Sequence, residues 1–122
     1  MQTLFDLTCV NTGRRVACVE RLSGFWECGR GIIGRAPGEP GTGYWLTGVA
    51  SIHTFFVSYP IDVIFLSSDF KLVGWRTNVR PWTPFVHAAG ATETFEMTAG
   101  SLLPNTAELT HNTQWKISAL CQ

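Results

Sequence analysis

The stretch that organises this chain is Ser51–Ser68, SIHTFFVSYPIDVIFLSS. It contains two apolar runs, Ile52–Val57 and Ile61–Leu66, which are separated by Ser58-Tyr59-Pro60. Each run has the length of a strand buried on both faces and is too short for an ordinary helix. The proline separates them, because it removes a backbone donor and restricts the residue before it. We predict that these two runs and Lys71–Arg76, which follows a short polar turn, form three consecutive antiparallel strands.

Two further extended patterns near the start of the chain predict a β-hairpin. Leu4–Val10 and Arg15–Leu22 are rich in Thr, Val and Leu, and Asn11–Arg14 joins them. Asn and Gly tolerate the positive φ that a tight hairpin turn requires. The glycine-rich segment that follows predicts no more than a short helical turn around Phe25–Cys28, and 36–43 predicts a surface loop.

Thr92–Thr98 alternates along its length and predicts a half-buried strand. Phe95 and Met97 occupy the face expected to point inward, and Glu96 shares the other face with three threonines. We therefore expect the Glu96 carboxylate to be solvated.

Three weaker signals complete the pattern. Tyr44–Thr47 predicts a short strand that leads into the central stretch. Asn105 and Glu108 have the spacing of a capping box, which predicts one helical turn over 106–110. Thr113–Leu120 predicts a closing strand. These elements predict one domain over residues 1–122 that is mainly β: a compact antiparallel sandwich or barrel-like domain with one or two short helices.

Charge is low and balanced in this chain. Charged residues make up 15% of the sequence, with 9 basic and 9 acidic side chains. A nucleic-acid binder that neutralises several phosphates through a broad basic surface is therefore not expected.

The N-terminal segment lacks a basic and apolar leader, and the apolar runs are too short to span a bilayer. We expect a soluble, cytoplasmic protein without membrane partners, present as a monomer or weak oligomer.

The cysteines at 9, 18, 28 and 121 should be mostly free thiols in a reducing compartment, although a Cys9–Cys18 bridge across the hairpin is geometrically possible. No local spacing of ligands predicts a metal, and no fingerprint predicts a cofactor.

Three motifs together carry a family resemblance. They are Arg30–Arg35 (RGIIGR), Ser51–Leu66 and Thr94–Gly100 (TFEMTAG), and the central block is the most specific. The chain resembles the uncharacterised prokaryotic family catalogued as domain of unknown function 192 (UPF0127-type) over most of its length. It departs from that pattern at Val57, where the family often has methionine, and at 111–112, where the family has Gly-Asp. The resemblance implies a compact mainly-β sandwich or barrel and no established activity.

His53, Asp62 and Glu96 are polar residues embedded in apolar runs. An imidazole beside a carboxylate makes a general base. The predicted strand pairing, however, separates His53 from Asp62 by roughly 10 Å or more, at about 3.3 Å per residue. We therefore expect Asp62 to be a structural carboxylate that binds backbone N–H groups near the Ser58–Ile61 break or an arginine such as Arg35. We expect a neighbouring carbonyl to satisfy His53.

A second group predicts a ligand pocket. Trp82 lies in Arg-Pro-Trp-Thr-Pro within the long connection Thr77–Thr92, and long connections are often functional. Trp82 forms one wall of a pocket for an anionic or planar ligand, or it packs on the protein's own sheet; the sequence leaves both open. The candidate ligand-binding residues are Arg35, His53, Thr54, Arg80 and Trp82.

Two hypotheses about function follow. The first is a non-catalytic module that binds a small molecule or a protein partner through a pocket near His53, Arg35 and Trp82. The second is a small hydrolase-like or isomerase-like enzyme that uses His53 with Asp62 or Glu96. We favour the first, because the chain has no nucleophile elbow, metal spacing or cofactor fingerprint.

Overall fold

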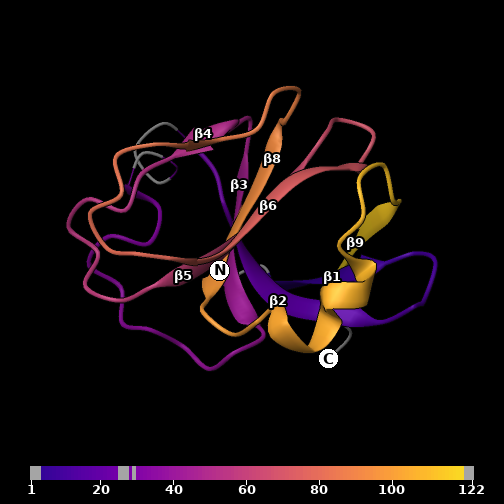
Figure 1. Ribbon diagram of the computed structural model, residues 1–122, viewed down its shortest axis with the longest axis horizontal. Coiled ribbons are helices and arrows are strands. Elements are labelled where there is room, and N and C mark those ends of the chain that lie inside the picture. Colours follow the sequence, from indigo (N-terminus) through magenta and orange to yellow (C-terminus); the bar gives the residue numbers. More distant parts are fainter. Residues whose placement is uncertain (1–3, 25–27, 29, 120–122) are drawn as a thin grey trace.

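The structure of the protein is a computed structural model that describes residues 4–24, 28 and 30–119. The mainly-β fold predicted from the sequence is confirmed in this part of the chain (Figure 1). The elements are β1 (Leu4–Cys9), β2 (Arg15–Leu22), β3 (Thr42–Thr47), β4 (Ser51–Ile52), β5 (Ile61–Leu66), β6 (Leu72–Val79), β7 (Val86–His87), β8 (Glu93–Thr98), the 3-10 helix η1 (Leu103–Glu108) and β9 (Trp115–Ala119).

The main sheet has seven strands in the order β6-β5-β8-β3-β2-β1-β9, and β4 and β7 form a separate two-stranded sheet. The predicted hairpin is confirmed, since β1 and β2 pair antiparallel across a turn in which Gly13 has a φ of 70°. The strands predicted around 44–47, 92–98 and 113–120 are confirmed as β3, β8 and β9, although Leu120 lies outside the described residues. One pair departs from the antiparallel expectation, because β2 and β3 are parallel.

The prediction that Ile52–Val57 forms a strand beside Ile61–Leu66 is wrong. Only Ser51–Ile52 is a strand, and it pairs with β7 in the small sheet. The pairing of β5 with β6 is confirmed, but the second neighbour of β5 is β8. With β6 and β8 on its two edges, β5 has no edge left for 52–57. Phe56 also has a φ of 65°, which lies in the left-handed region and outside the β region that strand residues normally occupy.

The helical turn predicted over 106–110 is present in part as η1, but the predicted capping box at its start is wrong. Helix η1 begins at Leu103, Pro104 lies in its first turn, and its N-cap residue Leu102 makes no side-chain capping bond. Proline suits this position because an N–H in the first turn of a helix has no acceptor within the helix, so its loss costs no hydrogen bond.

The connection Thr77–Thr92 has structure of its own, since β6 extends to Val79 and β7 lies within it. Of the helical turn predicted over Phe25–Cys28, residues 25–27 lie outside the described part, and Cys28 is helical.

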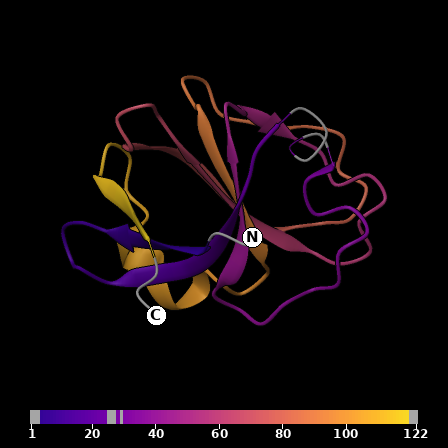
Figure 2. The ribbon, with the colours of Figure 1, turned by 180° about the vertical axis from the view of Figure 1, so that it is seen from behind.

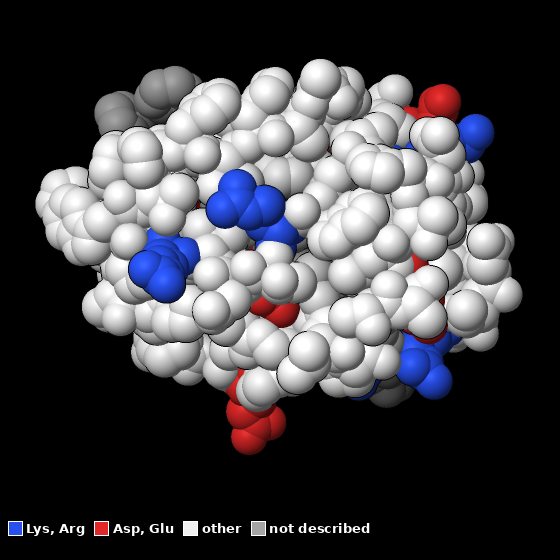
Figure 3. Space-filling model, viewed as in Figure 1, with Lys and Arg blue, Asp and Glu red and all other residues white. Residues whose placement is uncertain are grey.

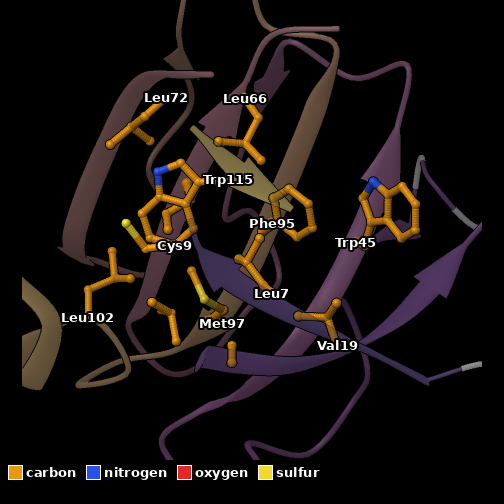
Figure 4. Packing of buried hydrophobic residues seen from close by; sticks show 13 residues of the cluster. Leu7, Cys9, Val19, Trp45, Leu66, Leu72, Phe95, Met97, Leu102 and Trp115 are labelled. Carbon is orange, nitrogen blue, oxygen red and sulfur yellow. The ribbon is translucent and has the colours of Figure 1, made fainter. Parts of the chain in front are cut away.

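One face of the sheet encloses a core around Trp115 (Figure 4). The sheet curves until its two ends meet: Trp115 N–H donates to Phe70 O at 2.8 Å, and Leu72 N–H donates to Thr113 O at 3.0 Å. Lys71 and Gln114 form a single bridge there. The two ends join only over this short stretch, and β6 and β9 do not pair along their edges, so the described part of the chain is not a closed barrel.

The other face of the sheet carries a second core that includes Ile61, Val63 and Phe65 of β5. Connecting segments rather than strands cover much of it, with Ile32, Ile52 and Val57 among the buried residues. Figures 1 and 2 show these connections gathered at the end of the molecule away from β9 and η1. The candidate site forms between them and the sheet. Within the described residues, no helix is long and apolar enough to cross a membrane.

Candidate functional site

A cavity of about 510 Å³ lies between the second face of the sheet and its covering segments. Its walls come from 30–33, from the β3–β4 connection with β4 and His53, and from Glu96 of β8. A volume of this size is typical of small-molecule sites.

Glu96 is the buried polar group of this cavity. It lies in the middle of the sheet, in register with Tyr44 of β3 and Val63 of β5, and only 3% of it is exposed. The expectation of a solvated carboxylate is therefore wrong. Both faces of β8 are buried. Its alternating side chains therefore point into two different cores, and neither face points to solvent.

The Glu96 carboxylate lies against the backbone of 31–32. The Ile32 N–H donates a hydrogen bond to it. Gly31 passes so close that a Cβ there would lie 2.8 Å from Oε1, and its φ of 54° also favours glycine. Oε1 itself accepts no hydrogen bond from the described residues. Burial raises the pKa of Glu96 to about 7, although the Ile32 bond and the charge of Arg35 act in the opposite direction.

Arg35 lies beside this carboxylate in a fixed position. Its Nε donates to Gly31 O at 2.8 Å, and its guanidinium lies 4.7 Å from the centroid of the Tyr44 ring. The Tyr59 hydroxyl donates to Arg35 O at 2.6 Å. Burial raises the pKa of Tyr59, and Tyr44 and Glu96 add to this effect while Arg35 opposes it. Arg35 lines a neighbouring cavity of about 350 Å³ rather than that of Glu96.

His53 lines the same cavity as Glu96. Its Nδ1 accepts a hydrogen bond from the Phe55 N–H at 3.1 Å, so its partner is an N–H and not the carbonyl that the sequence suggested. The neutral imidazole must then carry its proton on Nε2, which leaves that atom as a donor.

Asp62 lies outside this cavity and is 1% exposed. Its Oδ1 accepts from Asn78 N at 2.8 Å, and its Oδ2 accepts from Gly100 N at 3.1 Å and Leu102 N at 3.0 Å. The donors are backbone N–H groups, as expected, but not those near the Ser58–Ile61 break or Arg35, so that part of the prediction is wrong. Asp62 ties β5 to β6 and to the turn before η1.

Thr54 and Arg80 fix a loop. The Thr54 hydroxyl is fully buried; it donates to Arg80 O at 2.6 Å and accepts from Thr83 N at 2.7 Å. Arg80 takes part through its carbonyl, and its side chain is exposed.

Trp82 lies on that loop and is 57% exposed. Its ring packs beside Phe55 and Phe56, with centroids 5.9 and 4.8 Å away, so it is both presented and supported. It lines neither the cavity of His53 nor that of Arg35. The structure therefore does not bring His53, Arg35 and Trp82 into one pocket.

Cys28 and Arg30 also line the cavity, although neither was among the candidate site residues predicted from the sequence. The Cys28 thiol donates to Leu22 O at 3.5 Å, and Arg30 Nε donates to Ile33 O at 2.7 Å. One sequence feature could have located this site: Gly31 in the RGIIGR motif. A glycine there lets the backbone approach the Glu96 carboxylate closely. Among the described residues, no group of three or more His, Cys, Asp and Glu side chains could hold a metal ion.

Comparison with known proteins finds similarity to a curated protein. A UPF0127 protein of Thermococcus sibiricus (strain DSM 12597 / MM 739) is 37% identical over 68 residues, which are 56% of this chain and 44% of the relative. The chain thus spans less than half the length of the curated relative that it matches. No family model matches.

Solved structures support the fold alone. A "putative transcription regulator" from Sinorhizobium meliloti 1021 aligns with a TM-score of 0.78 at 16% identity, covering 96% of this chain and 94% of that one. A protein of unknown function from Novosphingobium aromaticivorans DSM 12444 aligns with a TM-score of 0.74 at 19% identity, covering 94% and 84%. The resemblance of this chain to the UPF0127-type family, which its motifs indicated, is confirmed by its curated relative.

Proposed function

We propose that this protein is a non-catalytic module that binds a small molecule in the cavity lined by His53 and Glu96. One observation carries the proposal: Glu96 is 3% exposed, lines a cavity of about 510 Å³ and has an oxygen without a donor among the described residues. A buried acceptor without a donor is unfavourable by about 1–3 kcal/mol. A ligand that supplies the donor recovers this energy.

The surroundings support a small ligand over a protein partner. The carboxylate lies below the backbone of 31–32, where a flat protein surface cannot reach it. Charged side chains form separate small groups over the face seen in Figure 3, and most of that face is uncharged.

We also infer a cytoplasmic location, which the free thiols of Cys9 and Cys18 support.

A fragment screen monitored by amide chemical shifts tests the proposal. We expect hits of some chemical class whose shift changes cluster at 30–33 and 47–53. Val49→Phe, which narrows the cavity, should abolish them. The matched change Val10→Phe, at a side chain 45% exposed on the first hairpin, should not. A chemically diverse screen with no hits at these segments would refute the proposal.

The second candidate is a small enzyme that uses Glu96 with His53. The pKa of Glu96, raised to about 7 by burial, favours it, because a general acid or base works best near the operating pH. Asp62 is the weaker partner for His53, since backbone N–H groups occupy both of its oxygens. Turnover of a bound fragment, lost in Glu96→Gln while binding remains, would establish the enzyme instead.

A further inference from the structure

The proposed cavity raises the question of which ligand chemistry suits it. We propose that the ligand is a small primary amine whose ammonium group donates to Glu96 Oε1 and whose carbon chain lies against the apolar wall. This inference rests on the proposed function and names the ligand class for the same cavity.

Oε1 accepts no hydrogen bond from the described residues, and four donors close to the cavity already have other acceptors or bind the carboxylate elsewhere. The Ile32 N–H binds the same carboxylate, and Arg35 Nε binds Gly31 O. Cys28 Sγ donates to Leu22 O, and Arg30 Nε donates to Ile33 O. An ammonium group brings up to three N–H donors to this one acceptor.

The charge of an ammonium group also suits this position. Burial raises the pKa of Glu96 to about 7, because an ionised carboxylate is unfavourable without a partner. A cation within hydrogen-bond distance stabilises the ionised form, whereas a neutral alcohol supplies a donor and no charge. An anionic ligand would place a second negative charge against the buried carboxylate.

The rest of the cavity accommodates a short carbon chain. Ile32, Ile33, Val49 and Ile52 contribute apolar walls. Arg30 is exposed and lies toward solvent, whereas Glu96 is buried at the sheet. A bound amine would therefore point its charged end inward, with its chain toward Arg30.

Three probes with the same four-carbon chain test this assignment: n-butylamine, n-butanol and butyrate. Titration monitored by amide chemical shifts at pH 7 should show n-butylamine binding at least about tenfold more tightly than n-butanol, since a hydrogen bond between charged groups is stronger than one from a neutral hydroxyl. Glu96→Gln keeps an acceptor for Ile32 and removes the charge. It should remove the preference for n-butylamine and leave n-butanol binding unchanged, and Glu39→Gln, at an exposed loop residue, should change neither.

The outcomes separate this inference from the proposed function. Tighter binding of butyrate, or equal binding of n-butylamine and n-butanol, would overturn the amine while leaving a ligand cavity. A diverse fragment screen without hits would overturn both. If Glu96→Gln does not fold, Val49→Phe replaces it: it should abolish n-butylamine binding, and retained binding would place the amine elsewhere and overturn the inference.

Discussion

At Glu96, burial and hydrogen bonding act on one carboxyl group in opposite directions. Burial dominates and raises the pKa to about 7 from an ordinary value of 4.5. The folded state therefore holds a proton that the unfolded state releases between these pH values. Stability from this group is lost as pH rises from about 4.5 to about 7, and it is constant above that range.

Glu96→Gln should remove this pH dependence. Relative to the variant, the wild-type free energy of unfolding should fall by about 3 kcal/mol between pH 4.5 and pH 7, because one pKa unit corresponds to about 1.4 kcal/mol. Urea unfolding at several pH values measures it, with the exposed Glu39→Gln as the control. Parallel pH profiles for wild type and Glu96→Gln would contradict the raised pKa.

Asp62 is the opposite case, a buried carboxylate whose two oxygens both have backbone donors. Asp62→Ala should lower the free energy of unfolding by about 1–3 kcal/mol, because it leaves buried N–H groups without an acceptor. Asp62→Asn should retain part of the bonding, and Asp69→Ala, at an exposed turn residue, should have little effect. Unchanged thermal stability together with lost ligand binding would assign Asp62 to the site instead.

Among the elements, β5 decides the arrangement of the sheet. It is buried along its whole length and is paired on both edges. The run 52–57 is therefore held by other means, and Thr54 is its main attachment: the Trp82 N–H also donates to Thr54 O at 2.8 Å.

Thr54→Val tests that attachment. The change keeps the shape of the side chain and removes the hydroxyl bonds to Arg80 O and Thr83 N, so it should lower stability by about 1–3 kcal/mol. Amide hydrogen exchange at Thr83 should also become faster. Thr77→Val, at an exposed position of β6, should change neither quantity. Unaltered exchange at Thr83 would show that the loop is held without Thr54.

At the scale of the whole molecule, the first core closes where the two ends of the sheet meet. Gln114 supports this junction, since its Nε2 donates to Asp69 O at 2.8 Å and to Phe70 O at 3.2 Å. Gln114→Leu should lower the free energy of unfolding by about 1–2 kcal/mol in urea unfolding. The change Lys116→Leu, at an exposed residue of β9, should have less effect, and equal effects would argue against a role for the junction.

The number of free cysteine thiols can be measured for the whole chain. Cys9 and Cys18 are free in the structure, so the bridge between them that the hairpin allowed is not formed. Thiol titration of the denatured, non-reduced protein should find close to four reactive groups, one for each of the 4 cysteines. Two or fewer would contradict a reducing compartment.

Features that depend on residues close together in the chain could be predicted from the sequence. Alternation and turn residues predicted the first hairpin, the pairing of β5 with β6, and strands β3, β8 and β9. A carboxylate within an apolar run also indicated that Asp62 has backbone donors. These inferences needed no knowledge of which strands far apart in the chain are neighbours.

The remaining features depend on contacts that form only in the folded protein. Residues 52–57 read as a strand, but β8 occupies the edge of β5 that they would need. Glu96 read as solvated, but covering segments bury that face of β8 as well. The cavity joins Arg30, His53 and Glu96 from three distant segments. Local patterns specify which residues can form strands and which face is apolar. Competition for strand edges, and the loops that cover a face, depend on contacts between residues far apart in the sequence.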